Sequence, residues 1–427
     1  MAEAVVRYAE PTGGATSGQC PESNPCTIVF AVETAAQPND EVVVMPGTYV
    51  LSNEVEVMDT GLDLHGQAGQ PRPLITSSAL QHGLNVTEPA TVRDLRVDFS
   101  GGAAGVNLEA STGQALGERL IVHASGGLAA CRLGDAAIRD SVCRSTNPGT
   151  DALVMTGSGS SNDFDATATN VTAHASTPPG SGTYGVFLHA AGDPGDGASL
   201  VLQGKNVIAG GADADVRVET AGSVSPFAAA FLINSNFEIS TSFGPGTEGH
   251  PAPEEGDNQT AEPVFVNAAS GNFHQVFGSP TINAGTGGLG LGTTDFDGQP
   301  RVQGTAPDIG ADEFPQSSPP GGGGGGDGDP PPPGGGGDND PPETTIDKGP
   351  KKKTKKRKAK FELSSDEPGS SFECKLDNKD FEPCDSSETF KVKRKRHALQ
   401  ARAVDQAGNA DPTPDSHAWK VKKKRKR

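Results

Sequence analysis

The sequence predicts an all-β protein in which a long solenoid of short strands precedes a small separate domain. Gly (57) and Pro (34) make up about a fifth of the 427 residues, and only 5% are aromatic. Because Gly and Pro both break helices, this composition disfavours a bundle of long helices. Short strand-like runs recur in pairs with a period of about 21 to 37 residues. An internal period of that size built from strands alone is typical of a solenoid.

The repeating pairs have two kinds of member. One kind carries a charged or polar residue followed by apolar residues, at 92–97, 116–122, 138–142, 168–172 and 204–208. The other kind follows about ten to fifteen residues later and alternates apolar with polar side chains, at Gly105–Ala110, Leu128–Leu133, Ala152–Gly157, Tyr184–Ala190 and Ala214–Thr220. A β-sandwich is the structural alternative, but its strands would not recur in such similar form.

Charge divides the chain into an acidic body and a basic end. Residues 1–340 contain 11 Lys and Arg against 40 Asp and Glu, a net charge of −29, whereas residues 341–427 contain 24 against 14, a net of +10. The Gly- and Pro-rich tract near the boundary cannot bury apolar surface and is predicted to be a linker. We therefore expect a solenoid at 1–316, a linker at 317–342 and a basic domain at 343–427.

The six cysteines fall in three close pairs: Cys20 with Cys26, Cys131 with Cys143, and Cys374 with Cys384. An even number in local pairs indicates disulfides formed in an oxidising compartment, although free buried thiols remain the alternative for the middle pair. No apolar run approaches the roughly 18 residues that a membrane span requires. We therefore expect a secreted or cell-surface protein without a membrane span.

Two ends of the predicted solenoid resemble a known family. Residues 20–26 and 39–49 resemble the opening of bacterial right-handed parallel β-helix proteins of the pectate-lyase-like superfamily. Residues 262–267, 295–301 and 307–314 resemble the C-terminal ending of such proteins. The resemblance implies a right-handed parallel β-helix that begins with an N-terminal capping helix.

The basic domain resembles bacterial immunoglobulin-like modules. The resemblance lies in Phe361–Pro368, Phe372–Asp377, Phe381–Cys384, Ala401–Asn409 and Asp411–Pro414. It implies a small C-terminal immunoglobulin-like β-sandwich with a Cys374–Cys384 bridge.

Alternation along the second kind of run places polar and aromatic side chains on one outward face. Coils of a β-helix stack about 4.8 Å apart, so outward side chains form ladders, and His189 is expected about 5 Å from Arg217. Carboxylates and amides bind sugar hydroxyls and an aromatic ring stacks on a sugar, which makes this face a candidate glycan site. An ordinary solvated sheet with charge ladders is the alternative. The candidate residues are Asn107, Glu109, Arg132, Phe187, His189, Asp215, Arg217 and Glu219.

The sequence assigns no catalytic residue. Polysaccharide lyases of the resembled fold use a carboxylate-held Ca²⁺ and an Arg or Lys base, but neither an Arg-Pro-x-x-Arg-like motif nor an Asp-Asp pair with a downstream Gly-His is present. We therefore favour a non-catalytic surface protein, with a binding, adhesion or structural role, that recognises polysaccharide and has no cofactor. A polysaccharide lyase or glycoside hydrolase, with Ca²⁺ if lyase-like, is the alternative.

An acidic cluster near Arg301 has two interpretations. Its oxygen ligands suit Ca²⁺. The interpretation that we favour is that Arg301 and the acids close the last coil as ion pairs and turn caps, with no metal. The acids are Asp295, Asp297, Asp308, Asp312 and Glu313.

Three basic runs, Lys351–Lys360, Lys391–Arg396 and Lys422–Arg427, mark the last domain. Such runs bind nucleic acid in some proteins or serve only solubility. In a secreted protein with disulfides, a polysaccharide or an anionic cell-envelope polymer is the expected partner, and specific nucleic-acid binding is not expected. We expect a monomer, and we expect any ligand site to lie on the outward face of the β-helix and not in this domain.

Overall fold

In the computed structural model, the chain forms two compact units, residues 1–314 and 315–427. The predicted linker 317–342 lies outside the described residues, as does most of the last basic run. The structure describes residues 4–12, 14–79, 81–158, 163–193, 196–222, 226–244, 247, 256–288, 290–315, 344–365, 371–377, 379, 381–384, 386, 388–404 and 414–422.

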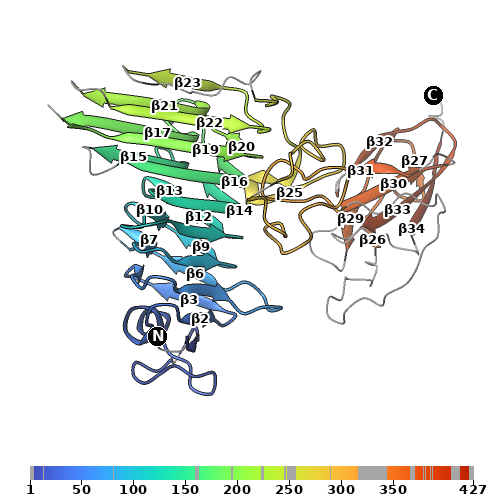
Figure 1. The fold of residues 1–427 in the computed structure, drawn as a ribbon. Helices are drawn as coiled ribbons and strands as arrows, with labels where there is room; N and C mark the ends of the chain where they lie inside the picture. Colours follow the sequence, from blue (N-terminus) through green and yellow to red (C-terminus); the bar gives the residue numbers. More distant parts are fainter. Residues whose placement is uncertain are drawn as a thin grey trace, which may run out of the picture. The chain divides into compact units, whose positions relative to one another are not determined.

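The first unit is a parallel β-helix, whose coils stack from β2 to β23 (Figure 1). Three faces surround its core, and successive coils pair in parallel register on each face. Corresponding positions in neighbouring coils lie between 21 residues apart (Gly117 and Ile138) and 36 residues apart (Ala168 and Gly204). This confirms the solenoid and its irregular period.

The strands of the β-helix are assigned to faces as follows. Face 1 contains β1 (Val6–Ala9), β2 (Glu41–Val44), β5 (Asp63–Gly66), β8 (Thr91–Arg93), β11 (Ala115–Glu118), the first halves of β14 (Ala136–Ser145) and β16 (Phe164–Ala175), β19 (Ser199–Lys205) and β22 (Phe227–Ile233). Face 2 contains β3 (Thr48–Leu51), β6 (Leu74–Ser77), β9 (Arg96–Phe99), β12 (Ile121–Ala124), the second halves of β14 and β16, and β20 (Ile208–Gly210). Face 3 contains β4 (Val55–Val57), β7 (His82–Val86), β10 (Ala104–Leu108), β13 (Ala129–Leu133), β15 (Asp151–Ser158), β17 (Tyr184–Asp193), β21 (Ala214–Gly222) and β23 (Ser240–Phe243), with β18 (Asp196–Gly197) antiparallel to β17.

The core is a set of apolar ladders. On face 3, one inward ladder has side chains that are at most 1% exposed and lie opposite one another from coil to coil: Leu84, Val106, Cys131, Leu153, Val186 and Val216. Alternation predicted this inward set, because successive side chains of a strand point to opposite faces. The disulfide Cys131–Cys143 crosses the core from β13 to β14, and the other two predicted disulfides, Cys20–Cys26 and Cys374–Cys384, are also present.

Faces 1 and 2 meet at a sharp bend that recurs in successive coils. At each bend one residue other than glycine adopts a left-handed backbone conformation, which Asn and Asp tolerate better than most residues. These residues account for the first kind of repeated run, in which a polar residue precedes apolar ones. The polar residue lies at the bend, and the residue after it points into the core. They are Asp94, Arg119, Asp140, Asn170, Asn206 and Asn234, with φ between 47° and 57°.

A short helical segment covers the N-terminal end of the β-helix. It consists of α1 (Ile28–Phe30) and the π-helical turn Ala31–Ala35, and it buries Ile28 and Val32. A capping helix was predicted here, but strand β1 precedes it and pairs with β2. The end of the core is therefore closed by both a helical turn and an added strand.

Residues 262–314, which we call the C-terminal segment, lie along the bend between faces 1 and 2. They contain β24 (Phe265–Asn267), β25 (Asn272–Gln275) and the 3₁₀ turn Ala268–Ser270. Arg301 binds Asp140 (2.7 Å), and the amide of Asn170 donates to the carbonyl of Leu291 (2.7 Å). The prediction that Arg301 closes the last coil is therefore wrong. The segment binds earlier coils because their bends present polar groups that it satisfies.

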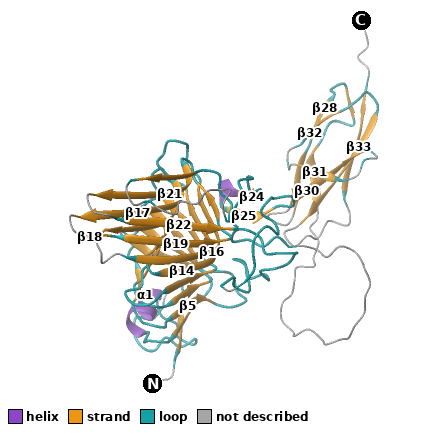
Figure 2. Ribbon diagram, turned by 45° about the horizontal axis from the view of Figure 1, so that its top comes forward, coloured by secondary structure: helices purple, strands orange, loops and turns teal. Residues whose placement is uncertain are grey.

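The second unit is a small β-sandwich (Figure 2). Its core includes the buried side chains of Leu399 on β33 and Trp419 on β34, which belong to one sheet, and that of Phe361, which lies between β28 and β29. Its relation to immunoglobulin-like modules remains a prediction. One sheet contains β27 (Lys353–Thr354), β34 (Asp415–Val421), β33 (Arg396–Val404), β30 (Ser371–Leu376) and β31 (Glu382–Cys384) in that order, and two smaller sheets pair β26 (Thr344–Lys348) with β29 (Glu362–Ser365) and β28 (Lys358–Lys360) with β32 (Thr389–Lys391).

Candidate functional site

The outward side of face 3 carries two rows of side chains that run along the axis of the β-helix. Register places the residues of each row opposite one another in successive coils, about 4.8 Å apart. The first row is Glu56, Asn85, Asn107, Arg132, Val154, Phe187, Arg217 and Thr241. The second row includes Thr156, His189, Glu219 and Phe243. Seven of the eight predicted face residues lie in or beside these rows.

One half of the face is polar and centres on Arg132. Its guanidinium donates to Asn107 (3.0 Å), to the carboxylate of Glu109 and to the hydroxyl of Thr156 (3.3 Å). Asn107 in turn donates to Asn85 (2.9 Å). The Arg132 and Glu109 side chains remain 23% and 29% exposed, so ligand groups can reach both.

The other half centres on Arg217 and is aromatic. Arg217 lies over the rings of Tyr184 and Phe243, 5.9 and 5.7 Å from their centroids. The rings of Tyr184 and Phe187 are 5.1 Å apart, and Phe187 lies 5.9 Å from His189. The Phe243 side chain is exposed, whereas Phe187 packs in a small apolar cluster with Val154.

Two details of the predicted face are wrong. Asp215 does not join the rows, because its carboxylate accepts backbone N–H groups of Gly211, Glu238 and Ile239. His189 is not opposite Arg217 but opposite Glu219. Both side chains nevertheless approach Glu219, with Nη2 of Arg217 at 3.2 Å and Nδ1 of His189 at 3.9 Å from its carboxylate oxygens.

Sequence reasoning missed Asn85, Thr156, Tyr184 and Phe243. Tyr184 was missed because the alternation of β17 shifts at Gly185, so Tyr184 lies beside Phe187 although the two are three residues apart. A Cβ atom at Gly185 would lie within 2.7 Å of a backbone nitrogen. A recurring small residue at this place in the coil is the sequence signal that would have found the shift.

The arrangement suits a long, polar ligand that lies on an open surface. Its amides, carboxylates and guanidiniums can exchange hydrogen bonds with hydroxyl groups, and its rings offer flat apolar surface. A shallow hollow of about 390 Å³ lies elsewhere, across β3, β6, β9 and β12 on face 2, where Asp98 and His123 line it. We consider face 3 the better candidate because it combines charge with aromatic surface.

The acidic cluster of the C-terminal segment has a different role. Each of its four most buried carboxylates accepts backbone N–H groups of the segment itself, so the carboxylates hold its turns together. Asp295 binds the N–H groups of Asp297, Gln299 and Glu313; Asp308 binds those of Asn283 and Phe314; Asp312 binds that of Gln275; and Glu313 binds those of Gln303 and Asp308. The predicted turn caps are therefore observed.

Burial makes these carboxyl groups hard to ionise. It raises the pKa of Asp295 and Asp308 to about 6, that of Asp312 to about 7 and that of Glu313 to about 8. Arg301, whose side chain is 1% exposed, adds positive charge and also donates to the carbonyls of residues 310 and 311. The cluster is thus part of the packing that fastens the segment to the β-helix.

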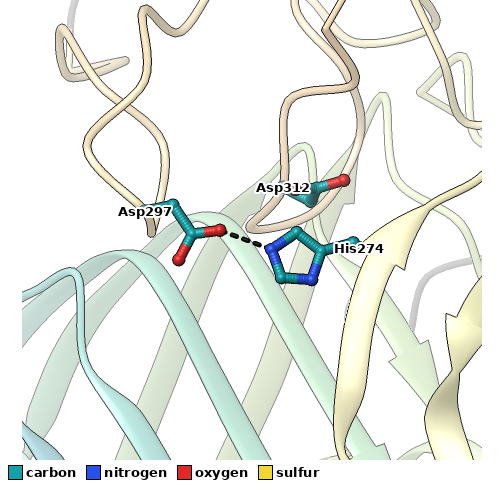
Figure 3. A group of neighbouring side chains, drawn as sticks. All are labelled: His274, Asp297 and Asp312. Carbon is teal, nitrogen blue, oxygen red and sulfur yellow. Dashed lines mark hydrogen bonds and ion pairs between the residues drawn. The ribbon is translucent and has the colours of Figure 1, made fainter. Parts of the chain in front are cut away.

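Only one group of possible metal ligands occurs among the described residues: His274, Asp297 and Asp312 (Figure 3). Both ring nitrogens of His274 already have partners, Asn272 and Asp297. Burial opposes protonation of His274, but the hydrogen bond and attraction of Asp297 raise its pKa overall. The group offers a histidine that is already paired with Asp297 and two carboxylates, those of Asp297 and Asp312. This set does not fit Ca²⁺, which prefers six to eight oxygen ligands.

No protein-family model and no curated protein matches the chain. Among solved structures, the chain is similar to one titled "Crystal structure of pectate lyase Pel9A", at 13% identity and a TM-score of 0.40. The match covers 73% of this chain and 97% of that chain. Similarity at this level carries no argument about function, so the functional conclusion depends on the geometry of face 3.

Proposed function

We propose that this protein is a non-catalytic, extracellular protein that binds a polysaccharide along face 3. The observation that carries the proposal is the alignment of a polar half around Arg132 and an aromatic half around Arg217 in the same rows. From β7 to β23 the rows extend about 29 Å, since six coil spacings separate these strands. A surface of this length offers contacts to several consecutive sugar units.

The pairing of the two arginines favours binding over catalysis. Arg132 is held by Glu109 and Arg217 by Glu219, so neither guanidinium lies free beside an empty position. A group that abstracts a proton must reach that proton within hydrogen-bond distance in the right protonation state. Paired guanidiniums are instead suited to fixed hydrogen bonds with hydroxyl or carboxylate groups of a glycan. A lyase acting on the same face is the rival that the experiment must exclude.

The location outside the cell rests on the cysteines. All six form disulfides, which persist in oxidising compartments. No helix in the described part of the chain is long and apolar enough to cross a membrane.

A glycan array followed by titration calorimetry tests the proposal. The full chain is expected to bind one class of polysaccharide, and the double variant Arg132→Ala/Arg217→Ala is expected to lose on the order of tenfold or more in affinity, because charge-assisted hydrogen bonds are the strong ones. Arg96→Ala is the matched control, since Arg96 forms an exposed ion pair with Asp98 on face 2.

Two results would contradict the proposal. Unchanged affinity in the folded double variant would leave face 3 as plain solvated surface. Ultraviolet absorbance from unsaturated products, formed by wild type but not by the double variant on an acidic polysaccharide, would show that the face is catalytic.

A further inference from the structure

Contrary to the expectation from the sequence that the ligand site lies only on the β-helix, we propose that the second unit carries a binding site of its own for an acidic polysaccharide. Its basic side chains come from the first two basic runs and from Lys420 on β34, just before the third run, at one end of the β-sandwich. The proposal goes beyond the function proposed for face 3 and does not depend on it, because the two sites lie in different units.

Backbone hydrogen bonds bring the three runs together. The first run, 351–360, bonds both to the strand that contains Lys420, which leads into the third run, and to the start of the second run, 391–396. The second run bonds to the same strand. The contacts are Lys420 N to Lys352 O (3.0 Å), Val392 N to Arg357 O (2.9 Å) and Val421 N to Lys395 O (3.0 Å).

Three cations form a row across neighbouring strands. Lys353 on β27 is opposite Lys420 on β34, and Lys420 is opposite Arg396 on β33. All three are exposed, and neighbouring strands are about 4.8 Å apart. A second like-charged pair, Lys358 and Lys391, is in register between β28 and β32. Like charges directly opposite one another destabilise a sheet, so this arrangement calls for an anion to balance it.

The described acidic residues do not neutralise the row. Within the described part of the second unit, no ion pair or side-chain hydrogen bond involves these five basic side chains. Asp377 lies near the start of β33, but it already binds Lys395 (3.0 Å), His397 (3.0 Å) and the backbone of Ala398 (3.1 Å). The row therefore keeps its positive charge available to a ligand.

The chemistry of the site favours a linear polyanion without bases. Proteins that bind single-stranded nucleic acid stack bases on exposed aromatic rings. None of the described aromatic side chains of this unit is exposed, and Phe361 and Trp419 are at most 2% exposed. A row of evenly spaced cations instead matches a chain with one carboxylate or sulfate at each repeat. The disulfide Cys374–Cys384 agrees with an extracellular ligand.

Binding of the full chain to heparin, measured by titration at several salt concentrations, tests the proposal. In Lys353→Gln/Lys420→Gln we expect weaker binding and a slope of log affinity against log salt that is smaller by roughly 2, since each charge contact contributes about 1. The control Arg96→Gln/Lys205→Gln also removes two positive charges, so it has the same net charge as the test variant, but its substitutions lie in the first unit. It should bind heparin as wild type does. Fluorescence of Trp419, the single Trp of the chain, shows whether the second unit remains folded.

A second readout uses the protein without ligand. Because the substitutions remove opposed like charges, the variant's second unit should melt at a higher temperature than that of wild type, and heparin should stabilise wild type more than the variant. Equal heparin affinity for variant and wild type, or an equal loss in the control, would overturn the proposal. Tighter binding to single-stranded DNA than to heparin at the same salt would overturn the assignment to polysaccharide.

Discussion

Face 3 and the C-terminal segment both gather ionisable side chains, but they use these groups in opposite ways. On face 3, Arg132 and Arg217 bind side-chain carboxylates and stay about a quarter exposed. Arg301 of the C-terminal segment and its partner Asp140 on β14 are at most 1% exposed. The difference shows that a cluster of charged residues can have either of two roles. It remains an accessible binding surface where it is left exposed, and it holds segments together where neighbouring coils bury it and backbone groups bind it.

The largest expected effect on stability concerns the buried ion pair between Arg301 and Asp140. Arg301→Met should lower the free energy of unfolding of the first unit by about 3–5 kcal/mol, because it leaves Asp140 buried without its partner. Arg96→Met, which breaks an exposed pair with Asp98, should cost at most about 1 kcal/mol. Urea unfolding followed by circular dichroism measures both.

A double variant controls this prediction. Arg301→Met combined with Asp140→Asn should recover much of the loss, since it removes both buried charges. Equal losses for Arg301→Met and Arg96→Met would mean that the segment is not fastened through this pair.

The disulfides should come next in size, and they separate the two units. Replacing Cys131 and Cys143 by Ala should cost the first unit about 3 kcal/mol, the value for a loop of this length. It should leave the transition reported by Trp419 unchanged. Replacing Cys374 and Cys384 should have the reverse pattern. A single shared transition in every variant would show that the units do not unfold independently.

The pH dependence should follow from the buried carboxyl groups of the segment. Their pKa values in the folded chain, about 6 to about 8, lie above the roughly 4 of the unfolded chain. The folded state therefore holds more protons between these values, and its stability falls as pH rises through them. We expect the first unit to be less stable at pH 9 than at pH 5, by on the order of a few kcal/mol.

The variant Asp312→Asn sharpens the pH prediction. The amide oxygen of Asn keeps the acceptor for the N–H of Gln275 but does not ionise. The fall in stability between pH 5 and pH 9 should therefore become smaller. An identical pH profile in thermal melts would contradict the assignment of a raised pKa to Asp312.

The smallest expected effect on stability is on face 3. Arg217→Ala should change the free energy of unfolding by less than about 1 kcal/mol, because its pair with Glu219 is partly exposed. It should nevertheless weaken glycan binding. A variant that loses several kcal/mol of stability would show that face 3 is a structural network like the C-terminal segment.

Much of the first unit could be predicted from local pattern. Alternation identified Val186 and Val216 as inward residues. The runs around Asp94 and Asp140 were recognised as repeats, but the bend at each of these two residues was not predicted. The three disulfides followed from close spacing. These features depend on residues near one another in the sequence, where strand geometry and side-chain type act directly.

The candidate face was predicted in outline but not in register. His189 and Arg217 were assigned to the right face. Which residues of two neighbouring coils lie opposite one another depends on the turns between the coils, and the lengths of these turns vary. Asp215 was a candidate because a carboxylate can bind a sugar hydroxyl. Its carboxylate instead accepts hydrogen bonds from three backbone N–H groups. Neither the lengths of the turns nor their unpaired N–H groups can be read from alternation.

The sequence by itself determined the elements of this protein: strands that bury one side, a repeated polar residue before apolar ones, paired cysteines and an acidic body with a basic end. Only the tertiary structure decided where distant segments meet. Arg301 binds Asp140 across 161 residues, and three basic runs converge on one end of the second unit. The physical reason is that such contacts form wherever unpaired backbone and charged groups find partners, which depends on the assembled surface and not on neighbours along the chain.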